Sequence, residues 1–197
     1  MVRRTQAQRS AETQALLLDA TIQSLVELGY PKTSTPEICR RAGVSRGAQL
    51  HHYPAKVDLL VAAMERLAAR RHEEFRALVR AGSTADARNQ AAFEDLWAIY
   101  AGPTLSAWLE LVVASRTDPG LAGPMGRLSE RLEDEAEVTL RELFGVQAQV
   151  PARASVRMVL SLLDGLALRT ILQGEDAARE ALMVFRTLVE PFLRGEP

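Results

Sequence analysis

The sequence has little cysteine, few aromatic residues and no long apolar segment. A single cysteine, Cys39, among 197 residues excludes an internal disulfide framework and a zinc site built from cysteines. No apolar run approaches the roughly 20 residues that a membrane-spanning helix needs, and the basic N-terminus lacks the apolar segment that follows in a secretory signal. The sequence therefore predicts an intracellular, cytoplasmic protein without a membrane partner.

The chain also lacks a large excess of charge of either sign, but its charges are unevenly distributed. It has 24 Lys and Arg against 25 Asp and Glu, and this balance excludes a uniformly basic nucleic-acid-binding protein. The first 56 residues carry eight basic and four acidic side chains, whereas the remainder carries 16 and 21. A basic segment on an acidic body favours a protein that approaches a polyanion with one end.

Helical spacing of apolar residues runs through the whole chain, and no segment shows the alternation of a half-buried strand. The sequence therefore predicts an all-α fold of about nine helices. The expected elements are a first helix that ends at Gly29, short helices from Thr35 and over Ser45–Tyr53, a long helix over 56–80, a linker at 81–84, and helices over about 86–101, 103–116, 119–144, 152–172 and 176–193.

Residues 34–53 combine a short helix, a glycine turn and a second short helix. The start Thr35–Glu37 offers a cap hydroxyl, an early proline and a first-turn acid. Gly43 permits the left-handed backbone of a tight turn, and Cys39 supplies a small residue where the two helices cross. This spacing is typical of a helix-turn-helix.

The residues around this motif follow a recognisable pattern: Leu28-Gly29-Tyr30, Thr33-Ser34-Thr35, Ile38, Ala42–Gly47, His52-Tyr53-Pro54, Lys56 and Leu59-Leu60. From about Ser10 to Leu67 the chain resembles the DNA-binding domain of the tetracycline-repressor (TetR) family of bacterial transcriptional regulators. The resemblance implies that residues 10–70 form a three-helix DNA-binding domain. It further implies that residues 71–197 form a helical bundle that dimerises and binds a ligand.

The recognition helix is expected over Ser45–Tyr53, with its N-terminal end in the major groove of double-stranded DNA. Arg46 is a candidate to read guanine through O6 and N7, and a phosphate contact is the alternative. Gly47 and Ala48 lack bulk and allow a close approach to the bases. Leu50 stands where the family commonly has tyrosine, and it could meet a thymine methyl group.

Gln49 departs from the family pattern, which usually has an apolar residue there. It either reads an adenine edge or forms a partly buried amide bonded to nearby backbone. Thr35, at the amide-rich start of the first motif helix, is expected to contact a phosphate. The resemblance implies further phosphate contacts from His51, His52, Tyr53 and Lys56.

A second candidate site lies in the body of the chain, where four of the ten aromatic residues fall between positions 93 and 108. The pattern indicates either an apolar ligand cavity or an ordinary core. Glu110 is expected to face solvent, so a ligand here is expected to be a small hydrophobic or aromatic molecule. The candidate lining residues are Phe93, Trp97, Tyr100, Trp108, Val112, Met125, Met158 and Leu162.

The last two expected helices have apolar faces wider than packing on one core requires. This width predicts a homodimer, and the alternative is a central position within a single domain. The candidate interface residues are Val159, Leu163, Leu166, Leu182, Phe185, Leu188, Val189 and Phe192.

Signatures of other chemistry are missing from the sequence. There is no Gly-x-Ser-x-Gly elbow, phosphate-binding loop or dinucleotide fingerprint, and the adjacent His51 and His52 cannot grip one metal as a pair four residues apart would. For Cys39, buried packing is favoured over redox sensing. We therefore expect neither an enzyme nor a cofactor or metal.

These observations predict a sequence-specific DNA-binding transcriptional regulator. The expected form is a ligand-responsive repressor that binds a palindromic operator as a homodimer. The alternative is a small-molecule-binding helical dimer, a carrier or chaperone, without specific DNA readout.

Overall fold

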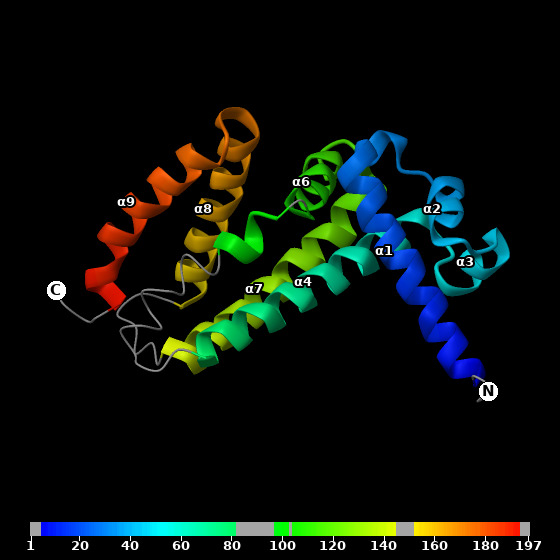
Figure 1. Cartoon of the computed structure of the whole chain (residues 1–197), viewed down its shortest axis with the longest axis horizontal. Coiled ribbons are helices and arrows are strands. Elements are labelled where there is room, and N and C mark those ends of the chain that lie inside the picture. The colour runs from blue at the N-terminus through cyan, green and yellow to red at the C-terminus, as the bar shows by residue number, and fades with distance from the viewer. Residues whose placement is uncertain (1–4, 82–96, 103, 145–151, 194–197) are drawn as a thin grey trace. The chain divides into compact units, whose positions relative to one another are not determined.

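Every regular element in the part of the chain that the structure describes is a helix. This computed structural model describes residues 5–81, 97–102, 104–144 and 152–193. A short helical segment at residues 97–100 accompanies the labelled helices (Figure 1), which are α1 (Gln6–Lys32), α2 (Thr35–Ala42), α3 (Arg46–His52), α4 (Lys56–Ala81), α6 (Thr104–Ser115), α7 (Pro119–Phe144), α8 (Ala152–Gln173) and α9 (Glu175–Leu193). The all-α prediction is confirmed. Residues 82–84 of the expected linker and 86–96 of the helix expected after it lie outside the described ranges.

The chain divides into two compact units, and each is described by itself. The first comprises Met1–Ala69 and Pro103–Leu128, and the second comprises Arg70–Gly102 and Ser129–Pro197. The expected domain boundary at residue 70 falls where α4 passes from one unit to the other. Residues 103–128 return to the first unit because α6 packs along α1. The functional domains 10–70 and 71–197 stay a prediction.

Helix α1 provides the surface on which α2 and α3 pack. It begins with a capping box, in which the Thr5 hydroxyl accepts from the Gln8 backbone at 3.2 Å and the Gln8 side chain accepts from the Thr5 backbone at 2.9 Å. The expected end at Gly29 is visible as a break, with φ 73 and ψ 173, and one more turn carries the helix to Lys32. The buried residues of its inner face include Leu17, Leu18 and Leu25.

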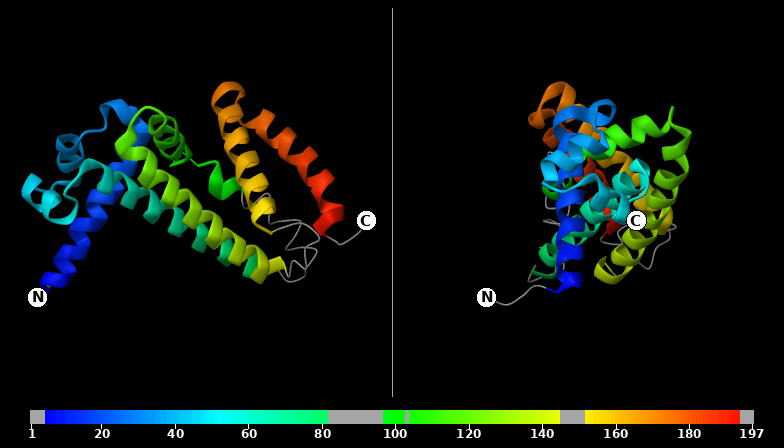
Figure 2. Two further views of the ribbon diagram at one scale, coloured as in Figure 1. Left: turned by 180° about the vertical axis from the view of Figure 1, so that it is seen from behind. Right: turned by 90° about the vertical axis from the view of Figure 1, so that its right-hand side faces the viewer.

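Helices α2 and α3 form the predicted helix-turn-helix beside α1 (Figures 1 and 2). The N-cap of α2 is Ser34, whose hydroxyl accepts from the Glu37 backbone at 3.4 Å, so the expected cap at Thr35 was one residue late. Gly43 ends α2 in the left-handed conformation, with φ 66. Ser45 caps α3 as predicted, accepting a backbone hydrogen bond of 3.1 Å.

The core of the first unit is completed by α4, α6 and the start of α7. An ion pair of 3.1 Å between Arg66 Nε and Asp19 Oδ1 also ties α4 to α1 at the surface. The buried side chains of these helices are Leu59, Leu60, Ala63, Met64, Leu67, Leu105, Ala107, Leu111, Leu121, Met125 and Leu128.

The second unit contains the antiparallel pair α8 and α9, joined by a turn at Gly174 (Figures 1 and 2). An ion pair of 2.9 Å between Arg157 Nε and Glu133 Oε2 links α8 to α7. The apolar cluster of this unit consists of Trp97, Leu163, Leu166, Ala178 and Leu182, with Tyr100, Ala101, Val159, Leu160 and Leu162 packed against it.

Replacing Gly43 with alanine should lower the free energy of unfolding by about 1 kcal/mol, because a Cβ is strained in the left-handed region. No heavy atom lies within 4 Å of the added Cβ, so the loss comes from the backbone alone. Gly47→Ala is the matched control and should stabilise α3 by about 0.5–1 kcal/mol. Urea unfolding followed by circular dichroism measures both. Equal stability of the two variants would contradict the turn conformation.

Candidate nucleic-acid interface

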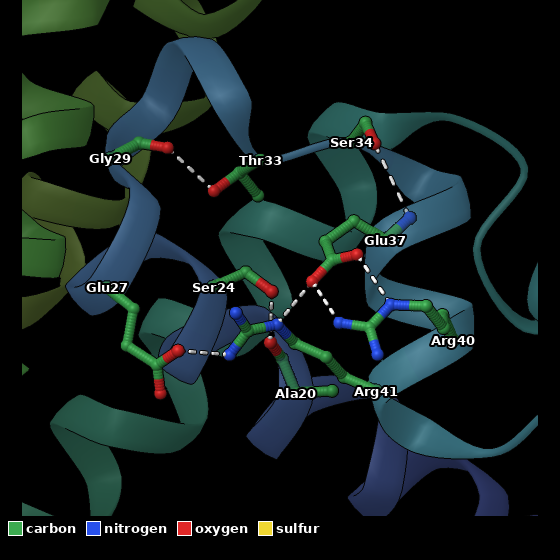
Figure 3. A network of polar contacts seen from close by, with 9 residues as sticks. All are labelled: Ala20, Ser24, Glu27, Gly29, Thr33, Ser34, Glu37, Arg40 and Arg41. Atoms are coloured by element: carbon green, nitrogen blue, oxygen red, sulfur yellow. Dashed lines mark hydrogen bonds and ion pairs between the residues drawn. The ribbon is translucent and has the colours of Figure 1, made fainter.

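A network of ion pairs fixes α2 against α1 (Figure 3). The Glu37 carboxylate accepts from Arg40 at 2.8 Å and 2.6 Å and from Arg41 Nε at 2.7 Å. Arg41 also reaches α1, with 2.6 Å between its Nη1 and Glu27 Oε2. The hydrogen bonds from Arg40 and Arg41 lower the pKa of Glu37 to about 2. Arg41 is thus the residue of this network that links α2 to α1, whereas Arg40 pairs within α2.

The other side of α2 is apolar and buried. Ile38, Cys39 and Ala42 all lie in the core of the first unit, and the Val44 backbone donates to the Cys39 carbonyl at 3.1 Å across the turn. Burial raises the pKa of the Cys39 thiol, so the thiol stays protonated and unreactive near neutral pH. This environment favours the packing role of Cys39.

One side of α3 faces solvent. Arg46, Gly47, Leu50 and His51 are exposed, whereas Ala48 is half-buried. Leu50 leaves 47% of its surface accessible. The exposed side therefore contains a guanidinium, a glycine without bulk and an apolar side chain, the combination predicted for reading base edges.

Gln49 points to the interior. Its side chain is only 1% exposed, and its Nε2 donates to the Tyr53 carbonyl at 2.5 Å. This burial contradicts the expectation that Gln49 reads an adenine edge and agrees with the alternative of a buried amide bonded to nearby backbone. Gln49 could reach a base only if α3 were rotated so that Leu50 took its place in the core. The structure has the opposite orientation, with Gln49 buried and Leu50 exposed.

The residues expected to contact phosphates are half-buried, apart from the exposed His51. His52 Nδ1 lies 3.4 Å from Gln14 Nε2 of α1, and burial raises the pKa of Tyr53. Lys56 Nζ lies 4.3 Å from the ring centroid of Tyr30. Thr35 lies in the first turn of α2. The contacts of these residues with DNA stay a prediction.

The residues of the second candidate site belong to both units. Trp97, Tyr100 and Leu162 lie in the apolar cluster of the second unit, where Met158 is exposed. In the first unit Met125 is buried, Trp108 is half-buried and Val112 is exposed. Phe93 lies outside the described residues. A cavity lined by these side chains stays a prediction.

The sequence did not predict the polar pair that Tyr100 and Asp164 form within the second unit. The Tyr100 hydroxyl donates to Asp164 Oδ1 at 2.9 Å, and burial raises the pKa of both groups. The Arg71 guanidinium carbon lies 5.3 Å from the Tyr100 ring centroid. The available signal was that Asp164 is the one charged residue within 158–168.

The expected dimer residues occupy different environments. Leu163, Leu166 and Leu182 are buried in the core of their own unit, which contradicts the expectation that they face a partner. The apolar side of these helices is wide enough to contact both the core of its own unit and a partner. The sequence pattern alone did not tell which residues face the core. Val159 and Phe185 are half-buried, and the side chains of Leu188, Val189 and Phe192 lie outside the described set. Among the side chains of α8 and α9 that the structure describes, the exposed large apolar ones are Met158, Leu168, Ile171, Leu172, Met183 and Val184.

Within the described ranges, no three His, Cys, Asp or Glu side chains lie together as a metal site would require. None of the described helices combines the length and hydropathy of a membrane span.

Residues 17–63 match the family described as bacterial regulatory proteins, tetR family, and residues 101–194 match the BetI-type transcriptional repressor, C-terminal family. The sequence is 33% identical to uncharacterized HTH-type transcriptional regulators of Mycobacterium bovis and Mycobacterium tuberculosis, over 94% of this chain and 97% of theirs. The chain belongs to the TetR family. It is therefore a DNA-binding transcriptional regulator of the helix-turn-helix type, from a family of regulators rather than enzymes.

Other relatives of this TetR-family regulator agree. It is 38% identical to the HTH-type transcriptional regulator CymR of Pseudomonas putida, in a match that spans 66% of this chain and 64% of CymR. A transcriptional regulator from Pseudomonas aeruginosa PAO1 has the same fold, with a TM-score of 0.71, 28% identity, and 98% and 94% of the two chains covered. A regulator from Saccharomonospora viridis, solved with choline, shares the fold at 20% identity, with a TM-score of 0.67 and 91% and 96% of the chains covered.

Glu37 should make the free energy of unfolding of the regulator fall as the solution is acidified. The pKa of its carboxyl is held at about 2 instead of the ordinary 4.5, so its ion pairs stabilise the fold above that ordinary value and lose their effect as the pH falls toward 2. Glu37→Gln should therefore flatten the dependence of unfolding free energy on pH between 4.5 and 2.

Urea unfolding at a series of pH values measures this dependence. Glu27→Gln removes only the pair between α1 and Arg41 and serves as the control, with a smaller loss of stability at neutral pH. Parallel pH profiles for the wild type and Glu37→Gln would show that the network has no such role.

Charge reversal at the exposed Arg46 should abolish DNA binding without unfolding the protein. Arg46→Glu replaces a donor to guanine or phosphate by a repelled carboxylate, so the affinity should fall by about 100-fold or more. A mobility shift with a duplex that the wild type selects from a random pool measures the change. Arg127→Glu, on exposed α7 surface, is the matched control. Unchanged binding by Arg46→Glu would refute the assignment.

Proposed function

We propose that this TetR-family regulator is a homodimeric, ligand-responsive repressor that acts in the cytoplasm on a palindromic operator. Each subunit would insert one α3 into the major groove of double-stranded DNA. Two-fold symmetry then requires inverted half-sites, with centres about 34 Å apart.

The exposed side of α3 is the observation that carries the DNA-binding part of the proposal. Arg46 would read guanine or hold a phosphate, and Leu50 would meet a thymine methyl group. Gly47, which has no side chain, would let the helix approach the bases. Base reading by Gln49 is no longer part of the proposal, since the amide is buried.

Phosphate contacts would fix the register of α3 on the duplex. The first turn of α2 offers backbone N–H groups that favour an anion, and Thr35 stands in that turn. The remaining phosphate contacts are assigned to His51, His52, Tyr53 and Lys56, whose side chains are donors of moderate or long reach.

A second copy of this chain would cover the exposed apolar side of α8. Met158, Leu168 and Leu172 follow one another at helical spacing along α8, with the exposed Gly165 between them. On α9, Met183 and Val184 are exposed as well. A row of exposed apolar residues with a glycine among them supports close packing of one helix on its copy.

The apolar cluster of the second unit supports a small hydrophobic or aromatic effector. Trp97 and Tyr100 would supply flat apolar surface, and the pair of Tyr100 with Asp164 would supply a polar contact inside it. The structure solved with choline supports a small-molecule site in this fold. The kind of effector proposed for this chain is inferred from its own apolar cluster. An effector would weaken operator binding only through different affinities for the two states.

Selection of DNA from a random pool tests the function directly. The wild-type chain should enrich one inverted-repeat sequence, and its affinity for that duplex should fall steeply as salt rises because bound counterions are released. A carrier or chaperone would enrich no sequence, and that result would overturn the proposal.

Replacing Leu168 with glutamate should separate the dimer, since a carboxylate would have to be buried in an apolar contact. Sedimentation should then give a monomer with unchanged helix content. Gln173→Glu, at an exposed position near the end of α8, is the control and should stay dimeric. A dimer that survives Leu168→Glu would place the interface elsewhere.

A further inference from the structure

Tyr30, which follows the left-handed Gly29, joins several segments of the first unit. Its backbone N–H donates to Glu110 Oε2 of α6 at 2.7 Å. Its hydroxyl donates to Asp118 Oδ2, in the turn before α7, at 2.5 Å. Its ring lies under Lys56 at the start of α4. One residue at the end of α1 thus contacts α4, α6 and the α6–α7 turn.

The backbone at Gly29 makes this junction possible. Its φ is 73, and a Cβ added there would lie 3.0 Å from Glu110 Oε2. Glycine therefore both adopts the required conformation and leaves room for the carboxylate to reach the backbone of Tyr30. The expectation that Glu110 faces solvent is wrong, because the carboxylate satisfies a donor freed by the break in α1.

The charges at the junction keep these contacts in place near neutral pH. The hydrogen bond to Asp118, together with burial, raises the pKa of Tyr30 to about 12, so the phenol remains a donor. The same bond lowers the pKa of Asp118. Burial lowers the pKa of Lys56, and the charge of Asp118 opposes that change. The ammonium is held at the aromatic face beside a carboxylate.

We propose that Tyr30 is a positioning residue that transmits the position of the α6–α7 turn to Lys56 and so sets the strength of its contact with the DNA backbone. This inference rests on the proposed function, in which Lys56 binds a phosphate. While Tyr30 is bonded to Asp118, its ring restricts the rotamers of Lys56. A shift of the turn that breaks the bond frees the ring, and ordering Lys56 on a phosphate then costs side-chain entropy.

The test uses variants of the full-length protein and the duplex that the wild type selects. Tyr30→Phe keeps the ring and the backbone bond to Glu110 but removes the bond to Asp118. It should weaken binding by about 3–10-fold, the cost of immobilising one long side chain. In a Lys56→Met background the same change should alter the affinity by less than about 2-fold, because the residue through which Tyr30 acts is gone.

The salt dependence gives a readout that a merely structural role would not move. Lys56→Met should reduce the slope of log affinity against log salt by about 1 for each phosphate that the variant no longer neutralises. Asp118→Ala removes the acceptor of this bond and should reproduce the effect of Tyr30→Phe, including its disappearance in the Lys56→Met background. This second variant also decides the question if Tyr30→Phe fails to fold.

A control separates this coupling from general loosening of the unit. Asp19→Asn removes the ion pair with Arg66 between α1 and α4 and should leave DNA affinity unchanged. The inference is overturned if Tyr30→Phe weakens binding equally with and without Lys56, or lowers only the unfolding temperature. Failure of the proposed function would show differently, as the absence of any selected duplex.

Discussion

The packing of α2 and α3 on α1 decides which side of α3 is free to meet DNA. Ile38 and Gln49 are both buried, and the ion pair between Arg41 and Glu27 links α2 to α1 at the surface. With Gln49 turned inward, helical geometry places Arg46 and Leu50, four residues apart, on the outer side. The reading surface is therefore a consequence of the core beneath it, and a rotation of α3 would exchange one set of side chains for the other.

The first unit also contains α6 and the start of α7, which come from later in the chain. The α6–α7 turn reaches the DNA-binding helices through Tyr30, whose contacts with Glu110 and Asp118 lie 80 and 88 positions away in sequence. A second tyrosine–aspartate bond, from Tyr100 to Asp164, lies in the apolar cluster of the other unit. Each bond joins segments that are distant in sequence. The bond of Tyr30 lies beside Lys56, which is proposed to bind DNA, and the bond of Tyr100 lies in the cluster that is proposed to bind the effector.

Local signals predicted most of the fold, whereas long-range packing was beyond the sequence. The turn at Gly43, the cap at Ser45 and the break at Gly29 depend on a few neighbouring residues, and the pattern predicted all three. By contrast, the inward sides of α8 and α9 depend on what packs against them, so Leu163 and Leu182 were assigned to the wrong face. Gln49 was ambiguous because an amide fits both a base edge and a buried carbonyl.

Site-specific photo-cross-linking tests the orientation of α3 most directly. A photoreactive amino acid at the exposed position of Leu50, in the full-length protein bound to its selected duplex, should cross-link to bases within the half-sites. The same group in place of Glu130, at an exposed position of α7, should give only background cross-linking. If position 50 cross-links no better than position 130 while the protein binds the duplex at full affinity, α3 does not present this side to DNA and the account is contradicted.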